Sequence, residues 1–246
     1  MQYASANRQL AYELVSGVSG LLLALFMFGH TFLVGSILAG ERSFDWVATV
    51  LEVLYIAQPT VVIIFVLFLL HAAFASRKIP AQLAERRRMI KLASDLARAG
   101  RKRPAAATEL SPLQSHVESV LWIWQVRTGM VILVLGSFHL VMMVLDVLTP
   151  LFGERVGIEA ATTLERERAG LWILYAILTV CVAFHTATGL YRLAVKWGVG
   201  ARFKRETLRW IEHIILWTML GAGAATLAVM AGLLPPPLSG LIGRGP

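Results

Sequence analysis

The sequence is poor in charged residues and nearly devoid of cysteine. Charged residues make up only 15% of the 246 positions and hydrophobic residues make up 57%, a balance too apolar for a soluble domain of this length. The single cysteine, Cys181, can neither hold an iron–sulfur cluster nor form an internal disulfide. No glycine-rich dinucleotide fingerprint follows a strand pattern. Any flavin or iron–sulfur chemistry connected with this chain therefore has to reside on other chains.

What the sequence does contain is a series of long apolar runs. Several exceed the roughly 18 residues needed to cross about 30 Å of hydrocarbon, and they lack the alternating polarity of barrel strands. We predict an all-α polytopic membrane protein of one domain, in which the first four of five transmembrane helices form the functional bundle. The predicted helices cover about 13–38, 55–76, 119–146, 171–197 and 208–233. The chain does not start like a cleaved signal peptide, so helix one is expected to be retained, and helix five is expected to serve packing alone.

Basic residues are concentrated in two of the four loops between these helices. The cytoplasmic loop predicted at 77–118 contains three successive arginines from Arg86, and the loop after helix four contains Lys204 and Arg205. Because positive charge stays on the cytoplasmic side, we predict that the N-terminus is cytoplasmic and the C-terminus lies outside. The net charge of +8 is then a topology signal and not a nucleic-acid-binding surface. A helical stretch at 82–99 either lies on anionic head groups, docks a soluble partner, or is only a solvated topology signal.

Four histidines lie inside the predicted helices one to four, with one in each helix: His30, His71, His139 and His185. An ionisable side chain at membrane depth is costly, so each one needs a specific partner. At about 1.5 Å per residue, His71 and His185 lie roughly 10 Å from the cytoplasmic boundary, and His30 and His139 roughly 10–16 Å from the outer one. Two opposed imidazoles at one depth are the ligands of a low-spin, electron-transferring haem. The quartet therefore predicts two stacked haem b groups with these histidines as iron ligands.

A haem-free role for the four histidines fits the sequence less well. They could be hydrogen-bonded residues in the core of a transporter, but the helix interiors offer few of the breaks and polar residues that line a transport path. A metal site without porphyrin would have too few ligands at each depth. His116 and His213, near the inner ends of helices three and five, are expected to be interfacial.

The segments around the four histidines resemble one known family. These are GLLLALFMFGH at 20–30, HAAFASRKIP at 71–80, LGSFH at 135–139 and HTATGLYRLAVKWG at 185–198. They are similar to the dihaem cytochrome b subunit of bacterial quinol:fumarate reductases and succinate:quinone oxidoreductases. The resemblance covers four of the five helices in the right order, and it implies that the four histidines are axial haem ligands, paired as their depths predict.

The resemblance also implies a function and further site residues. It implies a membrane anchor that oxidises menaquinol and passes electrons through two haems to iron–sulfur and FAD-containing flavoprotein subunits on the cytoplasmic side. Those partners, and not this chain, would reduce fumarate or, in reverse, oxidise succinate. Glu52 matches the family's quinol-site glutamate, and Trp122 and Lys196 match positions that contact propionates of the inner haem. A dimer of the three-subunit complex is allowed, and the cytochrome b anchor of a formate dehydrogenase or hydrogenase is the alternative.

One position departs from the family pattern. Members that move protons together with electrons carry a glutamate two residues before the ligand of helix four, where this sequence has Ala183. No other acid replaces it within the core of that helix. Protons released from quinol therefore either leave to the outside without compensation or follow another path.

Overall fold

The computed structural model describes residues 2–77, 79–101, 117–149 and 159–240. Every regular element in these ranges is a helix, which confirms the predicted all-α class. The elements are α1 (Gln2–Gly35), η1 (Ser36–Ala39), α2 (Glu41–Val53), α3 (Ala57–Ser76), α4 (Ile79–Arg101), α5 (Val117–Leu148), α6 (Ala160–Arg166), the π-helical turn η2 (Glu167–Leu171), α7 (Trp172–Lys196), η3 (Val199–Arg202) and α8 (Arg205–Met230).

Five helical segments of the described chain are long and apolar enough to cross a membrane, as predicted. They are Asn7–Ala39, Pro59–Leu96, Ser119–Asp146, Ala160–Lys196 and Arg205–Met230. Most of their apolar side chains point outward, and Val62, Val134 and Trp217 are each more than 60% exposed. An apolar exterior of this kind suits hydrocarbon and not water as the surrounding solvent.

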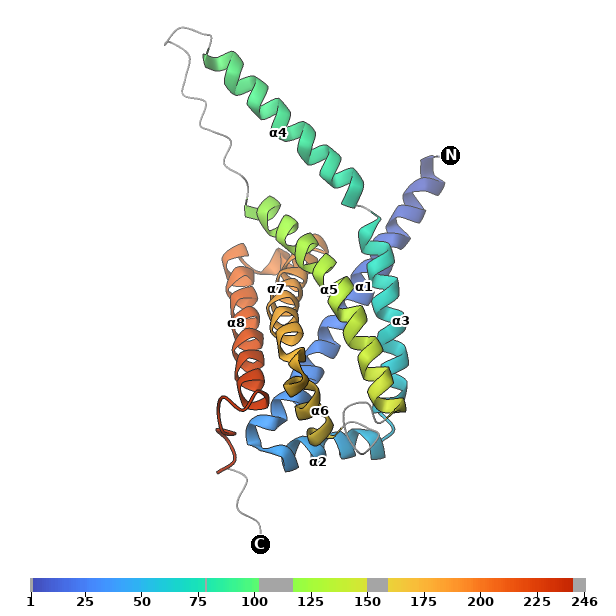
Figure 1. Cartoon of the computed structure of the whole chain (residues 1–246). Coiled ribbons are helices and arrows are strands. Elements are labelled where there is room, and N and C mark those ends of the chain that lie inside the picture. The colour runs from blue at the N-terminus through green and yellow to red at the C-terminus, as the bar shows by residue number, and fades with distance from the viewer. Residues whose placement is uncertain (1, 78, 102–116, 150–158, 241–246) are drawn as a thin grey trace.

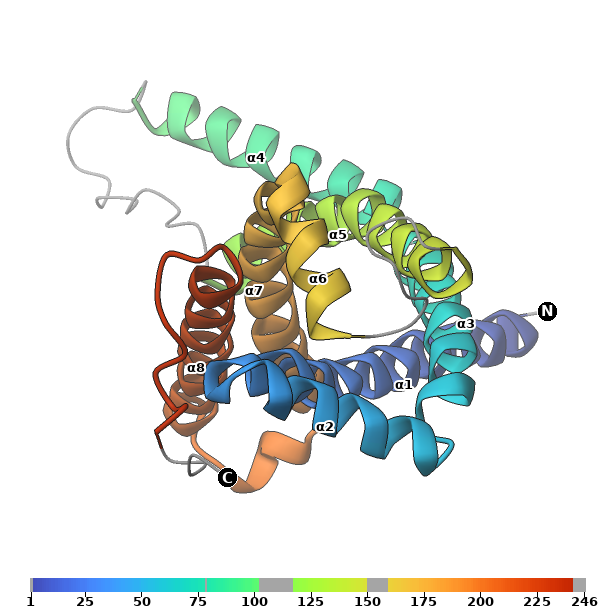
Figure 2. The same ribbon diagram turned by 60° about the horizontal axis from the view of Figure 1, so that its bottom comes forward.

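The spanning helices form one elongated bundle. α1, α3, α5, α7 and α8 run along it, α2 lies across one end, and α4 leaves from the opposite end (Figure 1). The main helix contacts are α1 with α3, α5 with α7, and α7 with α8. Viewed from the α2 end, α1, α3, α5 and α7 are grouped around one axis, with α8 at the edge beside α7 (Figure 2). The bundle of helices one to four and the peripheral fifth helix thus have the arrangement that the sequence predicts.

The end of the bundle that carries α2 contains most of its buried side chains. A small apolar core joins α2, α6, α8 and η1, made by Ile37, Phe44, Ala160, Leu164, Val229 and Met230. Gly40 turns the chain into α2 with a φ of 111°, a conformation that favours glycine. From α2, Asp45 Oδ1 accepts the backbone N–H of Ala160 at 2.7 Å and so caps the first turn of α6.

Two segments expected to be loops are helical. The acidic segment after helix one forms α2, and helix four begins at Ala160 instead of about 171 because α6 continues into α7 through the π-helical turn. A φ of 100° at Gly170 marks this turn, and glycine adopts such a value without steric cost. Glu165 and Glu167 consequently belong to a helix and not to an outer loop.

A buried ion pair ties α6 to α5. The guanidinium of Arg166 pairs with the carboxylate of Asp146, and both residues are at least 96% buried. Arg166 also donates to Thr163 Oγ1 at 3.3 Å. Removing one partner of such a pair leaves an uncompensated charge in a low-dielectric interior.

We therefore expect Asp146→Ala to lower the free energy of unfolding by about 3–5 kcal/mol. The matched control is Glu165→Ala, because Glu165 pairs with Arg168 at 3.4 Å with both side chains 60% exposed. Such a surface pair contributes only about 0–1 kcal/mol. Denaturant unfolding of both variants in detergent measures the difference, and equal midpoints would contradict a stabilising role for the buried pair.

Candidate functional site

The structure brings the four intramembrane histidines together in two pairs. His71 of α3 faces His185 of α7 with ring centres 6.3 Å apart and ring planes at 88°. His30 of α1 faces His139 of α5 with ring centres 6.2 Å apart and ring planes at 64°. The partners are those expected from their depths, and the His30–His139 pair is nearer the α2 end. All four rings are half-buried.

The spacing within each pair fits one metal ion held between two imidazoles. A metal–imidazole bond of about 2.0–2.1 Å, with roughly 1.1 Å from the nitrogen to the ring centre, puts opposed ring centres about 6.2–6.4 Å apart. No cluster of three or more His, Cys, Asp or Glu residues occurs in the described part of the chain. A metal at either pair would therefore take its remaining ligands from a macrocycle such as a porphyrin.

The hydrogen bonds of His71 orient its ring toward His185. Nδ1 of His71 lies 3.1 Å from the carbonyl oxygen of Ser16 and 3.4 Å from Ser19 Oγ. The Ser19 hydroxyl already donates to the carbonyl of Val15 at 2.6 Å, so it can only accept from the imidazole. The proton consequently resides on Nδ1 and leaves the lone pair of Nε2 free for a metal.

His185 is held in the same way by α5. Its Nδ1 lies 3.0 Å from the carbonyl oxygen of Gln125 and 3.4 Å from Thr128 Oγ1. The Thr128 hydroxyl donates to the carbonyl of Trp124 at 2.8 Å, so the tautomer of His185 matches that of His71. The side-chain amide of Gln125 also accepts a hydrogen bond from Arg192.

Two glycines let these rings lie against a neighbouring helix. A Cβ added at Gly20 would be 2.8 Å from Cε1 of His71, and one at Gly129 would be 2.9 Å from Cε1 of His185. In both helices the glycine follows a hydroxyl residue and comes four positions after the accepting carbonyl. We call a glycine on which an imidazole ring of a neighbouring helix packs in this way a glycine seat. The repeated Ser-Gly and Thr-Gly pairs are the sequence signal for the two glycine seats, which the hydrophobic pattern by itself does not reveal.

The second pair is held by side chains. His139 Nδ1 lies 3.4 Å from the hydroxyl of Tyr175, and Arg166 lies close enough to that hydroxyl to act on it electrostatically. Within the described residues, His30 makes no polar contact, and it stacks on Phe26 with ring centres 5.6 Å apart. The buried Arg166–Asp146 pair thus reaches His139 through Tyr175. Neither Tyr175 nor Arg166 is identifiable as a site residue from the sequence, because Arg166 falls in a segment expected to be a loop.

The remaining expected site residues lie at the two ends of the bundle. Trp122 is half-buried on α5, one turn before Gln125. Lys196, at the end of α7, forms an ion pair with Glu13 of α1. Glu52 is exposed near the end of α2, on the side of the His30–His139 pair. His213 is exposed on α8 and its Nδ1 lies 2.6 Å from the carbonyl of Arg209.

His116 lies outside the described residues. Ala183, where the family has a glutamate, is 1% exposed. Helix five supplies a buried carboxylate that the sequence did not single out: Glu212 accepts a hydrogen bond from Thr188 at 3.0 Å and pairs with Arg209. α8 therefore contributes a polar contact to α7 as well as packing.

The fold and the two histidine pairs define a polytopic helical membrane protein that carries facing imidazoles between its spanning helices. Residues 100–229 match the family of succinate dehydrogenase/fumarate reductase transmembrane subunits, and the chain belongs to this family. The fumarate reductase cytochrome b subunit of Wolinella succinogenes is 33% identical over 188 residues, which are 73% of this chain and 64% of that protein. The subunit of the same name from Helicobacter pylori is 29% identical over 215 residues, 84% of this chain and 73% of that protein. This chain thus aligns with just under two thirds of the Wolinella protein.

We expect Gly20→Ala to reduce the haem content of the purified protein by about half if each pair holds one haem, because the new methyl group displaces His71. Gly29→Ala is the matched control, since it lies on the same helix and a Cβ there meets nothing within 4 Å. A pyridine haemochrome assay measures both. Equal haem content in the two variants would show that the His71 ring does not depend on this seat.

Proposed function

We propose that this chain transfers electrons between a quinol and partner subunits through two b haems, one at each histidine pair. The observation that carries the proposal is the 6.2–6.3 Å separation of the opposed rings. The Nδ1 protons of His71 and His185 support it, since they leave Nε2 available to iron. When bound, a bis-imidazole haem supplies one-electron transfer without a change of ligands.

The helix seats give the distance between the two pairs. His71 rests on Gly20, ten residues before His30 on α1, and His185 rests on Gly129, ten residues before His139 on α5. At about 1.5 Å per residue, ten residues place the two pairs about 15 Å apart along the axes of α1 and α5. The two long helices thereby hold both sites at one fixed spacing, which suits electron transfer through the hydrocarbon layer.

The quinol site in this proposal lies at the α2 end, next to the His30–His139 pair. Oxidation of a hydroquinone releases two protons and two electrons, and the carboxylate of Glu52 accepts a proton from menaquinol there. The exposure of Glu52 on α2 leaves it a direct route to water. Trp122 and Lys196, at the other end, are assigned to the propionates of the inner haem.

The partners are proposed from the relatives, whose names identify them as subunits of fumarate reductase. An iron–sulfur subunit and an FAD-containing flavoprotein would dock on the cytoplasmic side, at the end from which α4 extends. That flavoprotein would reduce fumarate or, in reverse, oxidise succinate. The N-terminus is cytoplasmic in this arrangement, within the bacterial inner membrane. The names of the relatives favour this enzyme over a formate dehydrogenase or hydrogenase anchor.

His71→Ala and His139→Ala test the two-haem arrangement separately. Each variant is expected to lose about half of the b-type absorption in a dithionite-reduced minus oxidised spectrum, because each removes a ligand from one pair only. His213→Ala is the control, since His213 is exposed on α8 and bonds to its own helix. A wild-type spectrum without haem, in protein made with ample haem supply, would refute the proposal.

Glu52→Gln tests the quinol site. The rate of haem reduction by 2,3-dimethyl-1,4-naphthoquinol is expected to fall by about 10²-fold or more, as for loss of a general base. Haem content and reduction by dithionite should stay unchanged. Glu41→Gln, at the opposite end of the same helix α2, is the matched control. If both variants oxidise the quinol at the wild-type rate, Glu52 is not the proton acceptor.

A further inference from the structure

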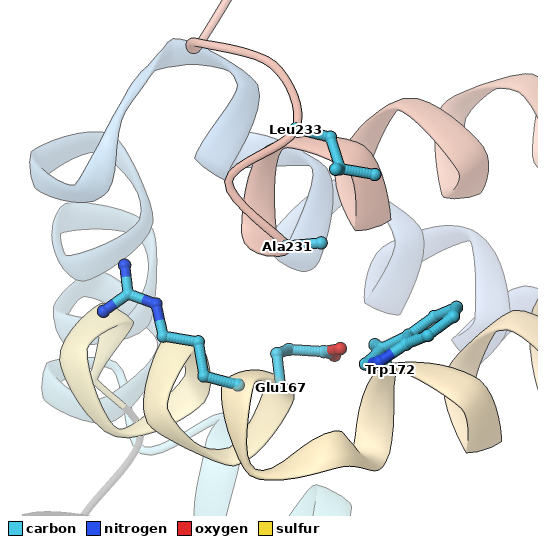
Figure 3. A pocket seen from close by; sticks show the side chains of 5 residues that line it. Glu167, Trp172, Ala231 and Leu233 are labelled. Atoms are coloured by element: carbon cyan, nitrogen blue, oxygen red, sulfur yellow. The ribbon is translucent and has the colours of Figure 1, made fainter.

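A pocket of about 410 Å³ lies where α6 passes into α7 and α8 ends. Its lining residues are Glu167, Arg168, Trp172, Ala231 and Leu233. Glu167 is the first residue of the π-helical turn η2, and Trp172 directly follows that turn (Figure 3). Such turns replace the regular helical hydrogen bonds and occur frequently at functional sites. Neither the histidine pairs nor Glu52 contribute to this pocket.

One carboxylate oxygen in the pocket has no hydrogen-bond donor. Glu167 is 96% buried, and its Oε2 has no hydrogen-bond partner among the described residues. Its side chain points into the space between Trp172 and Ala231 (Figure 3). A buried carboxylate without a donor is costly, so this oxygen calls for a ligand that supplies one.

The charges around Glu167 are already matched in other pairs. Arg166 is paired with Asp146, and Arg168 is paired with Glu165. Glu167 is therefore the acid of this cluster that has no ion-pair partner in the described part of the chain. A cation that can also donate a hydrogen bond would satisfy both its charge and its free oxygen.

The other residues that line the pocket indicate which kind of molecule contains that cationic group. Trp172 is 50% exposed and begins α7, and Leu233 is 77% exposed three residues beyond the membrane-spanning segment Arg205–Met230. Tryptophan at this level is typical of the membrane–water interface. The side chain of Arg168 is 60% exposed and can reach an anionic group outside the pocket. An amphiphile fits these residues if it has an ammonium group for Glu167, an adjacent phosphate for Arg168 and an apolar tail for Trp172 and Leu233.

The geometry points to a binding site for the head group of a phospholipid that carries a primary ammonium, such as phosphatidylethanolamine. The ammonium group donates to Glu167 Oε2, its phosphate lies near Arg168, and its glycerol and acyl parts contact Trp172 and Leu233. Phosphatidylcholine lacks the N–H donors, and phosphatidylglycerol lacks the positive charge, so neither replaces it. The inference is independent of the haems and of the quinol site.

Native mass spectrometry of the delipidated complex, with each of the three lipids added in turn, tests the site. Phosphatidylethanolamine is expected to bind about tenfold more tightly than phosphatidylcholine or phosphatidylglycerol, as for a charge-assisted hydrogen bond. Glu167→Gln should reduce its binding to the level of phosphatidylcholine. Glu41→Gln, which removes an exposed acid on α2 that does not line the pocket, should bind as the wild type does. Equal binding of the three lipids, or unchanged binding by Glu167→Gln, overturns the inference.

A second variant guards against a folding defect in Glu167→Gln. Ala231→Phe fills the pocket from α8 and leaves the carboxylate in place, and it should abolish the preference for phosphatidylethanolamine while haem content is retained. Free ethanolamine, added in excess, distinguishes a site for the whole lipid from one for any small amine, and displacement of the lipid by it overturns the assignment. Photolabelling of Trp172 by an azidonaphthoquinone, lost in Glu167→Gln, would also overturn it in favour of a quinol.

Discussion

The hydrogen bond from an imidazole Nδ1 to a backbone carbonyl of a neighbouring helix is the contact on which the rest of the site depends. In the pair His71–His185, each ring is held by a carbonyl that lies within a long helix and so cannot move independently. This bond sets the tautomer, the tautomer exposes Nε2, and the two Nε2 lone pairs become available to a single metal ion. The glycine seats follow from the same contact, because a ring can reach a backbone carbonyl only where no Cβ stands between them.

The two histidine pairs are held in the bundle by different kinds of polar group. At the His71–His185 level the protein uses backbone carbonyls and hydroxyls. At the His30–His139 level it uses a side-chain network in which Tyr175 joins His139 to Arg166. That network needs α6 inside the bundle, because α6 delivers Arg166. The cap that Asp45 places on α6 and the small apolar core beside it hold α6 there.

The features of this structure that can be predicted from the sequence are those set by the length of the apolar runs and by the depth of the histidines in the membrane. Continuous apolar runs longer than a bilayer is thick predicted the five helices, and distances from flanking charges paired the histidines correctly. The rotation of a helix about its axis is not predictable in this way, so the sequence does not connect Gly20 and Gly129 with the histidine rings. Helix four is longer than its sequence predicts, because its first turns carry Glu165, Arg166 and Glu167, which by composition favour an outer loop. The buried pair with Asp146 is what makes such a charged turn stable inside the bundle.

The two ways of holding a histidine also have different consequences for the chemistry of each site. A backbone acceptor is present whatever the side chain, so the electron-donating strength of His71 and His185 is insensitive to most substitutions in α1 and α5. His139 instead depends on a phenol whose own partner is a buried cation, and a cation near a metal site stabilises its reduced state. Since Arg166 is in turn neutralised by Asp146, the net field at the His30–His139 pair reflects a balance between two buried charges. The pair proposed to receive electrons from quinol is thus held through side chains, whereas the rings of the other pair are held mainly by backbone carbonyls.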